Sequence, residues 1–181
     1  MPLLHEDVER ILLTEEQLKA RVKELGDQIT ADYAGEPLVV VGILRGAAIF
    51  MSDLVRAIDL PLEMDFMAVS SYGNDVKTSG RVHIVQDTSL DVQGKHVLIA
   101  EDVLDTGLTL EHLIERFYAL KPASVSVATL MKKDNPDQRD VNCRYVGFQC
   151  PNEFIVGYGL DYAQRYRNLP YIGVLKPEVY A

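Results

Sequence analysis

The chain has 181 residues, of which 48% are hydrophobic and 25% charged, proportions typical of a globular protein with a sizeable core. Its formal net charge of −9 argues against nucleic acid or an anionic membrane as an electrostatically held partner. The two cysteines are too few for a disulfide framework or a cysteine-rich metal site, which favours reduced thiols.

The sequence shows no sign of a membrane segment or a secretory signal. No apolar run is long enough to span a bilayer. The first seven residues lack a basic region followed by an apolar stretch. We therefore expect a cytoplasmic protein with neither a membrane nor a nucleic acid partner.

Helices and strands alternate in the first half of the chain. Thr14-Glu-Glu-Gln17 matches a capping box, and the helix that it opens repeats apolar residues at helical spacing. Further elements are expected in this half: a buried strand over 37–44, a helix over about 47–57, a strand over 62–70, a polar loop over 71–80 and a short strand over 82–85.

The second half continues the alternation. We expect strands over 97–100 and 125–131, a helix over 109–120, and short strands near 145–148, 155–156 and 171–174. This order indicates an α/β fold, with a mainly parallel central sheet flanked by helices. Because no repeat or linker interrupts it, residues 1–181 are expected to form one domain. Its core would span about 35–132, and a small hood lobe would comprise the N-terminal segment and about 133–181.

The segment Val97–Thr109 carries the most chemistry. Two carboxylates, Glu101 and Asp102, follow a buried strand, and ligands of open α/β sheets bind beyond the carboxyl ends of strands. The loop Asp105–Thr109 opens into a helix, whose free N–H groups and positive dipole end bind phosphate. Carboxylates accept hydrogen bonds from vicinal ribose hydroxyls, so the segment suits a sugar phosphate. The alternative is an ordinary loop in which Thr106 is only a helix N-cap.

This segment resembles the phosphoribosyl diphosphate motif of the type I phosphoribosyltransferases. Over the region from Thr14 to about Val174, the chain is similar to the bacterial hypoxanthine-guanine phosphoribosyltransferases. The matching motifs, in family order and spacing, are Leu44-Arg-Gly46, Ser71-Tyr72, Glu101–Thr109, Lys133 and Phe154–Asp161. The resemblance implies the type I fold, Mg²⁺ as cofactor and a homodimer or homotetramer.

The implied reaction is one of purine salvage. The 5-phosphoribosyl group passes from 5-phospho-α-D-ribosyl 1-diphosphate to N9 of hypoxanthine or guanine, through a transition state that resembles an oxocarbenium ion. The products are IMP or GMP and pyrophosphate.

The resemblance also implies a role for each matching residue. Asp105 would be the acid/base residue at N7 of the purine, and the loop 71–80 a lid. Phosphoribosyl diphosphate would contact Leu44, Arg45, Gly46, Ser71, Tyr72, Glu101, Asp102, Asp105, Thr106, Gly107, Leu108, Thr109 and Arg167. The purine would contact Lys133, which donates to its 6-oxo group, together with Phe154, which stacks on it, Ile155 and Asp161. Magnesium would bind Glu101, Asp102 and Asp161, and family members often have a cis peptide bond at the Leu44–Arg45 loop.

Two positions depart from part of the family. Arg45 stands where some members have lysine, and Glu153 where some have a basic residue. Three alternatives remain open: a xanthine- or guanine-preferring phosphoribosyltransferase, a nucleotide-sensing regulatory protein on the same fold, and a receiver-like phosphate-binding domain. The acidic composition argues against the second, and the third leaves Lys133 and Phe154 unexplained.

Overall fold

A six-stranded sheet forms the larger part of the molecule. The computed structural model describes residues 4–71 and 82–181. The strands of the sheet are β2 (Leu38–Leu44), β3 (Leu62–Ser71), β4 (Val82–Gln86), β5 (His96–Leu104), β6 (Ser124–Lys133) and β7 (Cys143–Cys150). Their order is β4-β3-β2-β5-β6-β7, and all neighbours are parallel except β4, which pairs antiparallel with β3.

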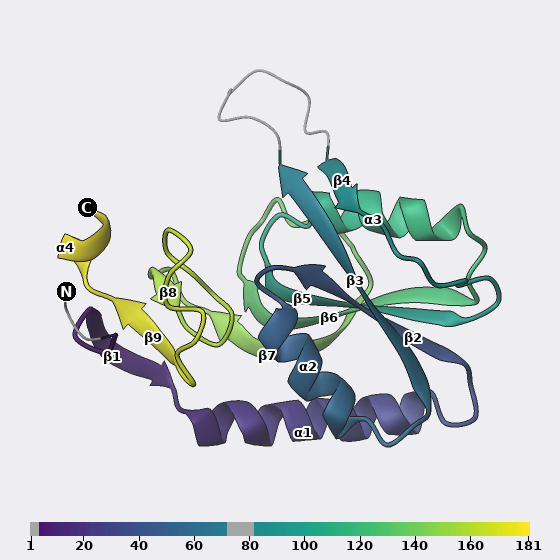
Figure 1. Cartoon of the computed structure of the whole chain (residues 1–181), viewed down its shortest axis with the longest axis horizontal. Coiled ribbons are helices and arrows are strands. Elements are labelled where there is room, and N and C mark those ends of the chain that lie inside the picture. Colours follow the sequence, from purple (N-terminus) through teal and green to yellow (C-terminus); the bar gives the residue numbers. More distant parts are fainter. Residues whose placement is uncertain (1–3, 72–81) are drawn as a thin grey trace.

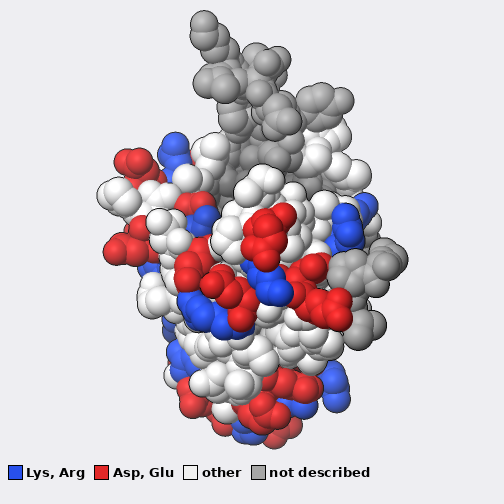
Figure 2. All heavy atoms as spheres, turned by 90° about the vertical axis from the view of Figure 1, so that its left-hand side faces the viewer, with Lys and Arg blue, Asp and Glu red and all other residues white. Residues whose placement is uncertain are grey.

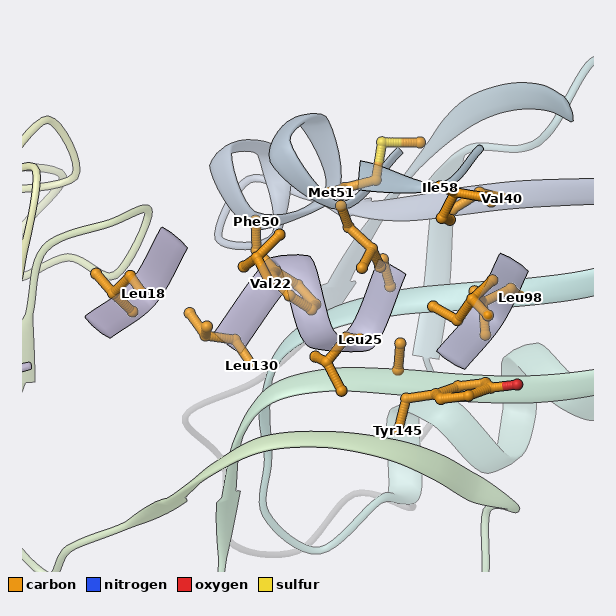
Figure 3. Close-up of a cluster of buried hydrophobic side chains, with 14 of the residues drawn as sticks. Leu18, Val22, Leu25, Val40, Phe50, Met51, Ile58, Leu98, Leu130 and Tyr145 are labelled. Atoms are coloured by element: carbon orange, nitrogen blue, oxygen red, sulfur yellow. The ribbon is translucent and has the colours of Figure 1, made fainter. Parts of the chain in front are cut away.

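Helices cover both faces of this sheet (Figure 1). The helices α1 (Glu15–Asp32) and α2 (Ala48–Ala57) lie on one face, and α3 (Leu108–Tyr118) packs on the other. Figure 3 shows Leu18, Val22 and Leu25 of α1 in one buried cluster with Phe50 of α2 and Leu98 of β5. The α/β fold with a mainly parallel sheet is thus confirmed.

The capping box predicted at the start of α1 is also present. The Thr14 side chain accepts a hydrogen bond from the Gln17 backbone N–H, and the Gln17 side chain accepts one from Thr14. These two bonds satisfy backbone donors that a helix start would otherwise leave free, which fixes where α1 begins.

A second, three-stranded sheet joins the two ends of the chain. Its strands are β1 (Val8–Leu13), β9 (Ile172–Leu175) and β8 (Ile155–Val156), in the antiparallel order β1-β9-β8. A short helix, α4 (Pro177–Tyr180), follows β9. This sheet and α4 lie at one end of the molecule, with the N- and C-terminal segments side by side (Figure 1). Figure 2 shows acidic and basic side chains intermixed on this end.

Several element boundaries differ from the prediction. The strand expected to end at Ala100 continues to Leu104, because β6 runs on beside it and pairs with Val103 and Leu104. The acidic pair therefore lies within β5, not after it. The strand β7, expected in the hood, pairs in parallel with β6 and belongs to the larger sheet.

Two expectations fall partly or wholly outside the described residues. The loop predicted over 71–80 lies outside them except for the backbone of Ser71, which ends β3, so Tyr72 and the lid remain predictions.

In residues 4–71 and 82–181, no helix is both long and apolar enough to cross a membrane.

The strand order places a crevice at the carboxyl ends of the two central strands of the larger sheet, β2 and β5. From β2 the chain moves to β3 on one side, whereas from β5 it moves to β6 and β7 on the other. Such a reversal separates the loops that leave the two central strands, and open α/β sheets bind ligands there. The carboxyl ends of β2 and β5 carry Leu44 and the segment that begins at Glu101.

Candidate active site

Two adjoining cavities open at the carboxyl ends of the central strands. The first, of about 300 Å³, is lined by residues of the β2 end and of the segment from β5 to α3: Leu44, Gly46, Glu101, Asp102, Asp105, Thr106, Gly107, Leu108 and Thr109 among them. The second, of about 350 Å³, shares Asp102, Val103 and Asp105 with the first. A ligand with two parts could thus occupy both at once.

The loop after β2 lies directly against Asp102. The peptide bond between Leu44 and Arg45 is cis, a point that the sequence left open. A Cβ atom added to Gly46 would lie 1.6 Å from the Asp102 Oδ2 atom, so only glycine leaves room for this carboxylate. The Val103 backbone N–H donates to the other oxygen, Oδ1, at 2.7 Å. These contacts fix the position of Asp102 in the cavity wall.

The acidic pair is electrostatically unfavourable as it stands. Burial and the neighbouring Asp102 carboxylate raise the pKa of the Glu101 carboxyl well above its usual range. Cations or hydroxyl donors placed beside the pair would relieve this cost. The pair therefore suits ribose hydroxyls, a metal ion, or both.

The loop before α3 presents a free helix end to the first cavity. Gly107 occupies the N-cap position with a left-handed backbone (φ 78°) that favours glycine. Within the described part of the chain, no side chain caps α3, and the Thr106 hydroxyl approaches the Leu108 N–H only at 3.4 Å. The alternative in which Thr106 is the N-cap is therefore wrong. The first N–H groups of α3 face a cavity that suits phosphate.

The second cavity brings the expected purine-binding residues together. Lys133 comes from the end of β6, Ile155 from β8, and Phe154 directly precedes β8. These three residues and Asp161 line the cavity with Cys150, Glu153, Leu160 and the shared residues. The side chains are mixed, with an apolar wall and an ammonium group, as a heterocyclic base requires.

Asp105 stands where the two cavities meet and holds two donors. The Lys133 ammonium donates to Asp105 Oδ2 at 2.9 Å, and the Asn135 side-chain amide donates to Oδ1 at 2.7 Å. These bonds, that of Lys133 first, hold the pKa of the Asp105 carboxyl below its usual range despite some desolvation. Asp105 is thus a carboxylate at neutral pH.

The Phe154 ring is held by two other aromatic rings. Tyr180, from α4, stacks on it with ring centroids 4.8 Å apart and planes 21° apart. Tyr162 meets it at 88°, with centroids 5.4 Å apart. Neither tyrosine lines the second cavity, whereas Phe154 does. The ring is therefore supported from outside the cavity and remains partly exposed to it.

The two arginines expected at the diphosphate do not line either cavity. Arg45 and Arg167 instead donate to the same atom, Gln164 Oε1, at 3.0 and 3.1 Å. Arg167 also pairs with Asp161 Oδ1 at 2.9 Å, while the Gln164 backbone N–H donates to Asp161 Oδ2 at 2.8 Å. The structure thus gathers both guanidinium groups around one oxygen atom at the rim of the site.

The site offers few protein ligands for a magnesium ion. Within residues 4–71 and 82–181, no group of three or more His, Cys, Asp or Glu side chains could hold a metal ion. The adjacent carboxylates of Glu101 and Asp102 are hard oxygen donors, and Mg²⁺ commonly binds through one or two carboxylates together with substrate phosphates and water. The residues present fit such a shared ion. Asp161 is already engaged by Arg167 and Gln164.

Sequence reasoning missed several residues of the site. Asn135, Gln164 and Tyr180 contact predicted site residues but belong to no motif that singled them out. Asn135 lies in a polar turn after β6, and polar turns are common on any surface. Only the three-dimensional contacts show that these side chains reach the site.

Comparison with known proteins identifies the family. The phosphoribosyl transferase domain model matches residues 10–163. Hypoxanthine-guanine phosphoribosyltransferases of Bacillus subtilis and Staphylococcus aureus are 49% and 51% identical to this chain, over 98% of it and 99% of their own length. The bifunctional protein TilS/HprT of Listeria innocua is 50% identical over 98% of this chain, which spans 28% of that longer protein.

Solved structures agree with the sequence comparison. A hypoxanthine phosphoribosyltransferase from Staphylococcus aureus superposes with a TM-score of 0.94 at 50% identity, covering 99% of this chain and 98% of that one. The hypoxanthine phosphoribosyltransferase of Trypanosoma cruzi, in a ternary complex with substrates, gives 0.89 at 42% identity, covering 97% and 100%. The chain therefore belongs to the phosphoribosyl transferase family, within its hypoxanthine-guanine phosphoribosyltransferase branch.

Proposed function

We propose that this protein transfers the 5-phosphoribosyl group of 5-phospho-α-D-ribosyl 1-diphosphate to N9 of hypoxanthine or guanine, forming IMP or GMP and pyrophosphate. One observation carries this proposal: two cavities meet at Asp105, one suited to a sugar phosphate and the other to a 6-oxopurine. The two relatives from Bacillus subtilis and Staphylococcus aureus, both named hypoxanthine-guanine phosphoribosyltransferase, support the same assignment.

The first cavity would bind the phosphorylated sugar. The loop Asp105–Thr109 and the start of α3 would hold the 5-phosphate through backbone N–H groups. Glu101 and Asp102 would accept hydrogen bonds from the two ribose hydroxyls. The diphosphate would then lie toward Leu44 and Gly46. Arg45 and Arg167 would give up their hydrogen bonds to Gln164 and donate instead to the diphosphate oxygens. Ser71 and Tyr72 would cover the diphosphate.

The second cavity would bind the base beside the reacting carbon. Phe154 would stack on the purine ring, with Ile155 and Asp161 at its edge. Lys133 offers donors only, so it pairs with a 6-oxo group and leaves the 6-amino group of adenine without an acceptor. Because O6 and N7 lie on the same edge of the purine, the adjacent Lys133 and Asp105 groups match that edge.

The chemical step would proceed with Asp105 as the base. The bond from C1′ to the diphosphate oxygen breaks, and its electron pair leaves with the diphosphate. The N9 lone pair forms the new bond to C1′, and the proton on N7 passes to the Asp105 carboxylate. Positive charge on the ribosyl ring develops in between, near the carboxylates of Glu101 and Asp102. By microscopic reversibility, protonated Asp105 would act as the general acid in the reverse reaction, pyrophosphorolysis.

Magnesium is the expected cofactor. Glu101 and Asp102 would hold it together with substrate oxygens, and the resemblance adds Asp161. When bound, the ion would neutralise the negative charge of the departing diphosphate. We expect chelation of Mg²⁺ to abolish turnover and added Mg²⁺ to restore it.

The test is pyrophosphate release with phosphoribosyl diphosphate and Mg²⁺, offering hypoxanthine, guanine, xanthine and adenine in turn. Turnover with hypoxanthine or guanine and none with adenine is the expected result. A clear preference for xanthine or guanine over hypoxanthine would favour the xanthine- or guanine-preferring alternative. Tight nucleotide binding without turnover on any base would instead indicate a regulatory protein on this fold.

Assembly and location remain expectations of the same proposal. Exposed apolar side chains, including Ile49 of α2 (41% exposed) and Met64 of β3 (45% exposed), would suit contacts between copies. We propose a cytoplasmic homodimer or homotetramer of single-domain subunits. Light scattering of the purified chain distinguishes these states from a monomer.

A further inference from the structure

The turn that follows β6 is bound to the proposed catalytic carboxylate at several points. Asn135 Nδ2 donates to Asp105 Oδ1 at 2.7 Å, and Gln138 Nε2 donates to the Asp105 backbone carbonyl at 2.9 Å. Next to them, the Arg139 backbone N–H donates to the Thr106 carbonyl at 2.9 Å. Both the side chain and the backbone of Asp105 are therefore held by a segment that belongs to no predicted motif.

The orientation of the Asn135 amide is determined at both of its ends. Its Oδ1 atom accepts the Asp137 backbone N–H at 2.9 Å, and its Nδ2 atom faces a carboxylate, which can only accept. A flipped amide would place an acceptor against the Asp105 carboxylate and a donor against an N–H group. The turn itself is closed by the Gln138 N–H, which donates to the Asn135 carbonyl at 3.1 Å.

This arrangement divides the two oxygens of Asp105 between two tasks. Oδ1 is occupied by Asn135, whereas Oδ2 is bound by Lys133, whose ammonium group has further donors for a purine oxygen. The oxygen beside Lys133 is thus the one positioned for N7 of the base. We propose that Asn135, supported by Gln138, is a positioning residue that holds the Asp105 carboxylate in the orientation that proton transfer requires.

The inference rests on the proposed function, because it concerns the residue assigned there to proton transfer. The charged groups around Asp105 are Lys133 at the end of β6, Glu101 and Asp102 on β5, and Glu153 and Asp161 across the second cavity. Cys150, at the end of β7, borders the same cavity. Asn135, unlike these charged groups, is a neutral donor to Asp105. Its removal therefore changes the orientation of the Asp105 carboxylate without removing a charge.

The test compares Asn135→Ala and Asn135→Asp with a control in the same turn, Asp137→Asn. The Asp137 side chain is exposed, and its substitution preserves the backbone N–H that binds Asn135. Full-length variants are assayed with phosphoribosyl diphosphate, Mg²⁺ and hypoxanthine, measuring kcat, both KM values and the pH profile of kcat/KM. Thermal melting establishes that each variant is folded.

For Asn135→Ala we expect kcat to fall about tenfold, the factor that corresponds to one hydrogen bond to a charged group, with both KM values unchanged. The acid limb of the profile should move to higher pH, because the carboxylate form of Asp105 loses a donor. Asn135→Asp, which adds a negative charge, should move it further, whereas the control should resemble the wild type.

Three results would count against these assignments, and they are distinguishable. An unchanged kcat and acid limb in both Asn135 variants would overturn the positioning role. A rise in both KM values without a shift of the acid limb would show a merely structural turn. Absence of turnover in the wild type with every base would overturn the proposed function itself.

Discussion

Gly46→Ala is predicted to lower the activity of the protein strongly while lowering its stability only slightly. The new Cβ would lie 1.6 Å from Asp102 Oδ2 and 2.5 Å from its Cγ. Restoring an ordinary contact requires the carboxylate to move by about 1.5–2 Å. This displacement breaks its hydrogen bond from the Val103 N–H and removes Asp102 from the wall of the first cavity.

The expected costs differ for the two properties. The displaced atoms are the end of a side chain, so the free energy of unfolding should fall by only about 1 kcal/mol, the value of one hydrogen bond. Because a misplacement of about 1 Å in an active site can cost 100-fold, kcat/KM for phosphoribosyl diphosphate should fall by about that factor. Thermal melting and initial rates of pyrophosphate release measure the two effects.

Gly94→Ala provides the matched control. Gly94 has a left-handed backbone (φ 71°) with no heavy atom within 4 Å of an added Cβ, so alanine there is strained but collides with nothing. We expect it to lose about 1–2 kcal/mol of stability while its kcat/KM stays that of the wild type. If Gly46→Ala kept full activity, or if both variants lost it equally, the argument from the Asp102 contact would be refuted.

Four further outcomes are expected. Asp105→Asn should lower kcat by a large factor while leaving the melting temperature near that of the wild type; an unchanged rate would end its acid/base assignment. Lys133→Ala should erase the preference for 6-oxopurines over adenine in the base panel. Tyr33→Phe should cost about 1–3 kcal/mol in urea unfolding, because it removes the 2.8 Å partner of the buried Ser126 hydroxyl. Asp65→Asn should weaken the loss of stability in acid, measured by melting at a series of pH values.

The sign of the Asp65 effect follows from its contacts. Burial alone would raise the pKa of Asp65, but hydrogen bonds from the Ser89 and Phe66 N–H groups and from the Thr88 and Ser89 hydroxyls lower it below the ordinary value of 3.8. A carboxyl whose pKa is lower in the folded state stabilises the protein above its unfolded pKa. That contribution disappears as the pH falls from about 4 through the folded value. A variant as acid-sensitive as the wild type would contradict this account.

The sequence predicted most reliably what depends on local periodicity and on motifs. The face of α1 made by Leu18, Val22, Leu25 and Ile29 is buried as its spacing predicts, and Thr14 caps the helix as its motif predicts. The four residues expected around the purine, Lys133, Phe154, Ile155 and Asp161, line one cavity. Their roles toward substrates remain predictions.

What the sequence did not predict depends on partners that lie far away along the chain. The strand β1 has no clear alternation of polar and apolar residues, and its partner β9 lies near the other end of the chain. The extension of β5 past Glu101 depends on the length of β6 beside it. The contact of Arg45 with Gln164, which keeps that arginine out of the first cavity, depends on a loop whose positive φ angles no local pattern announced.

The sheet that joins the two chain ends has a consequence for the order in which the protein matures during synthesis. The strands of the larger sheet are complete at Cys150, and every described residue that lines the first cavity precedes that point. The wall of the second cavity at Ile155 is held by β9, which pairs with both β8 and β1. A nascent chain would therefore complete the wall of the first cavity before that of the second, which would be held in place only once Ile172–Leu175 has emerged to pair with β8 and β1.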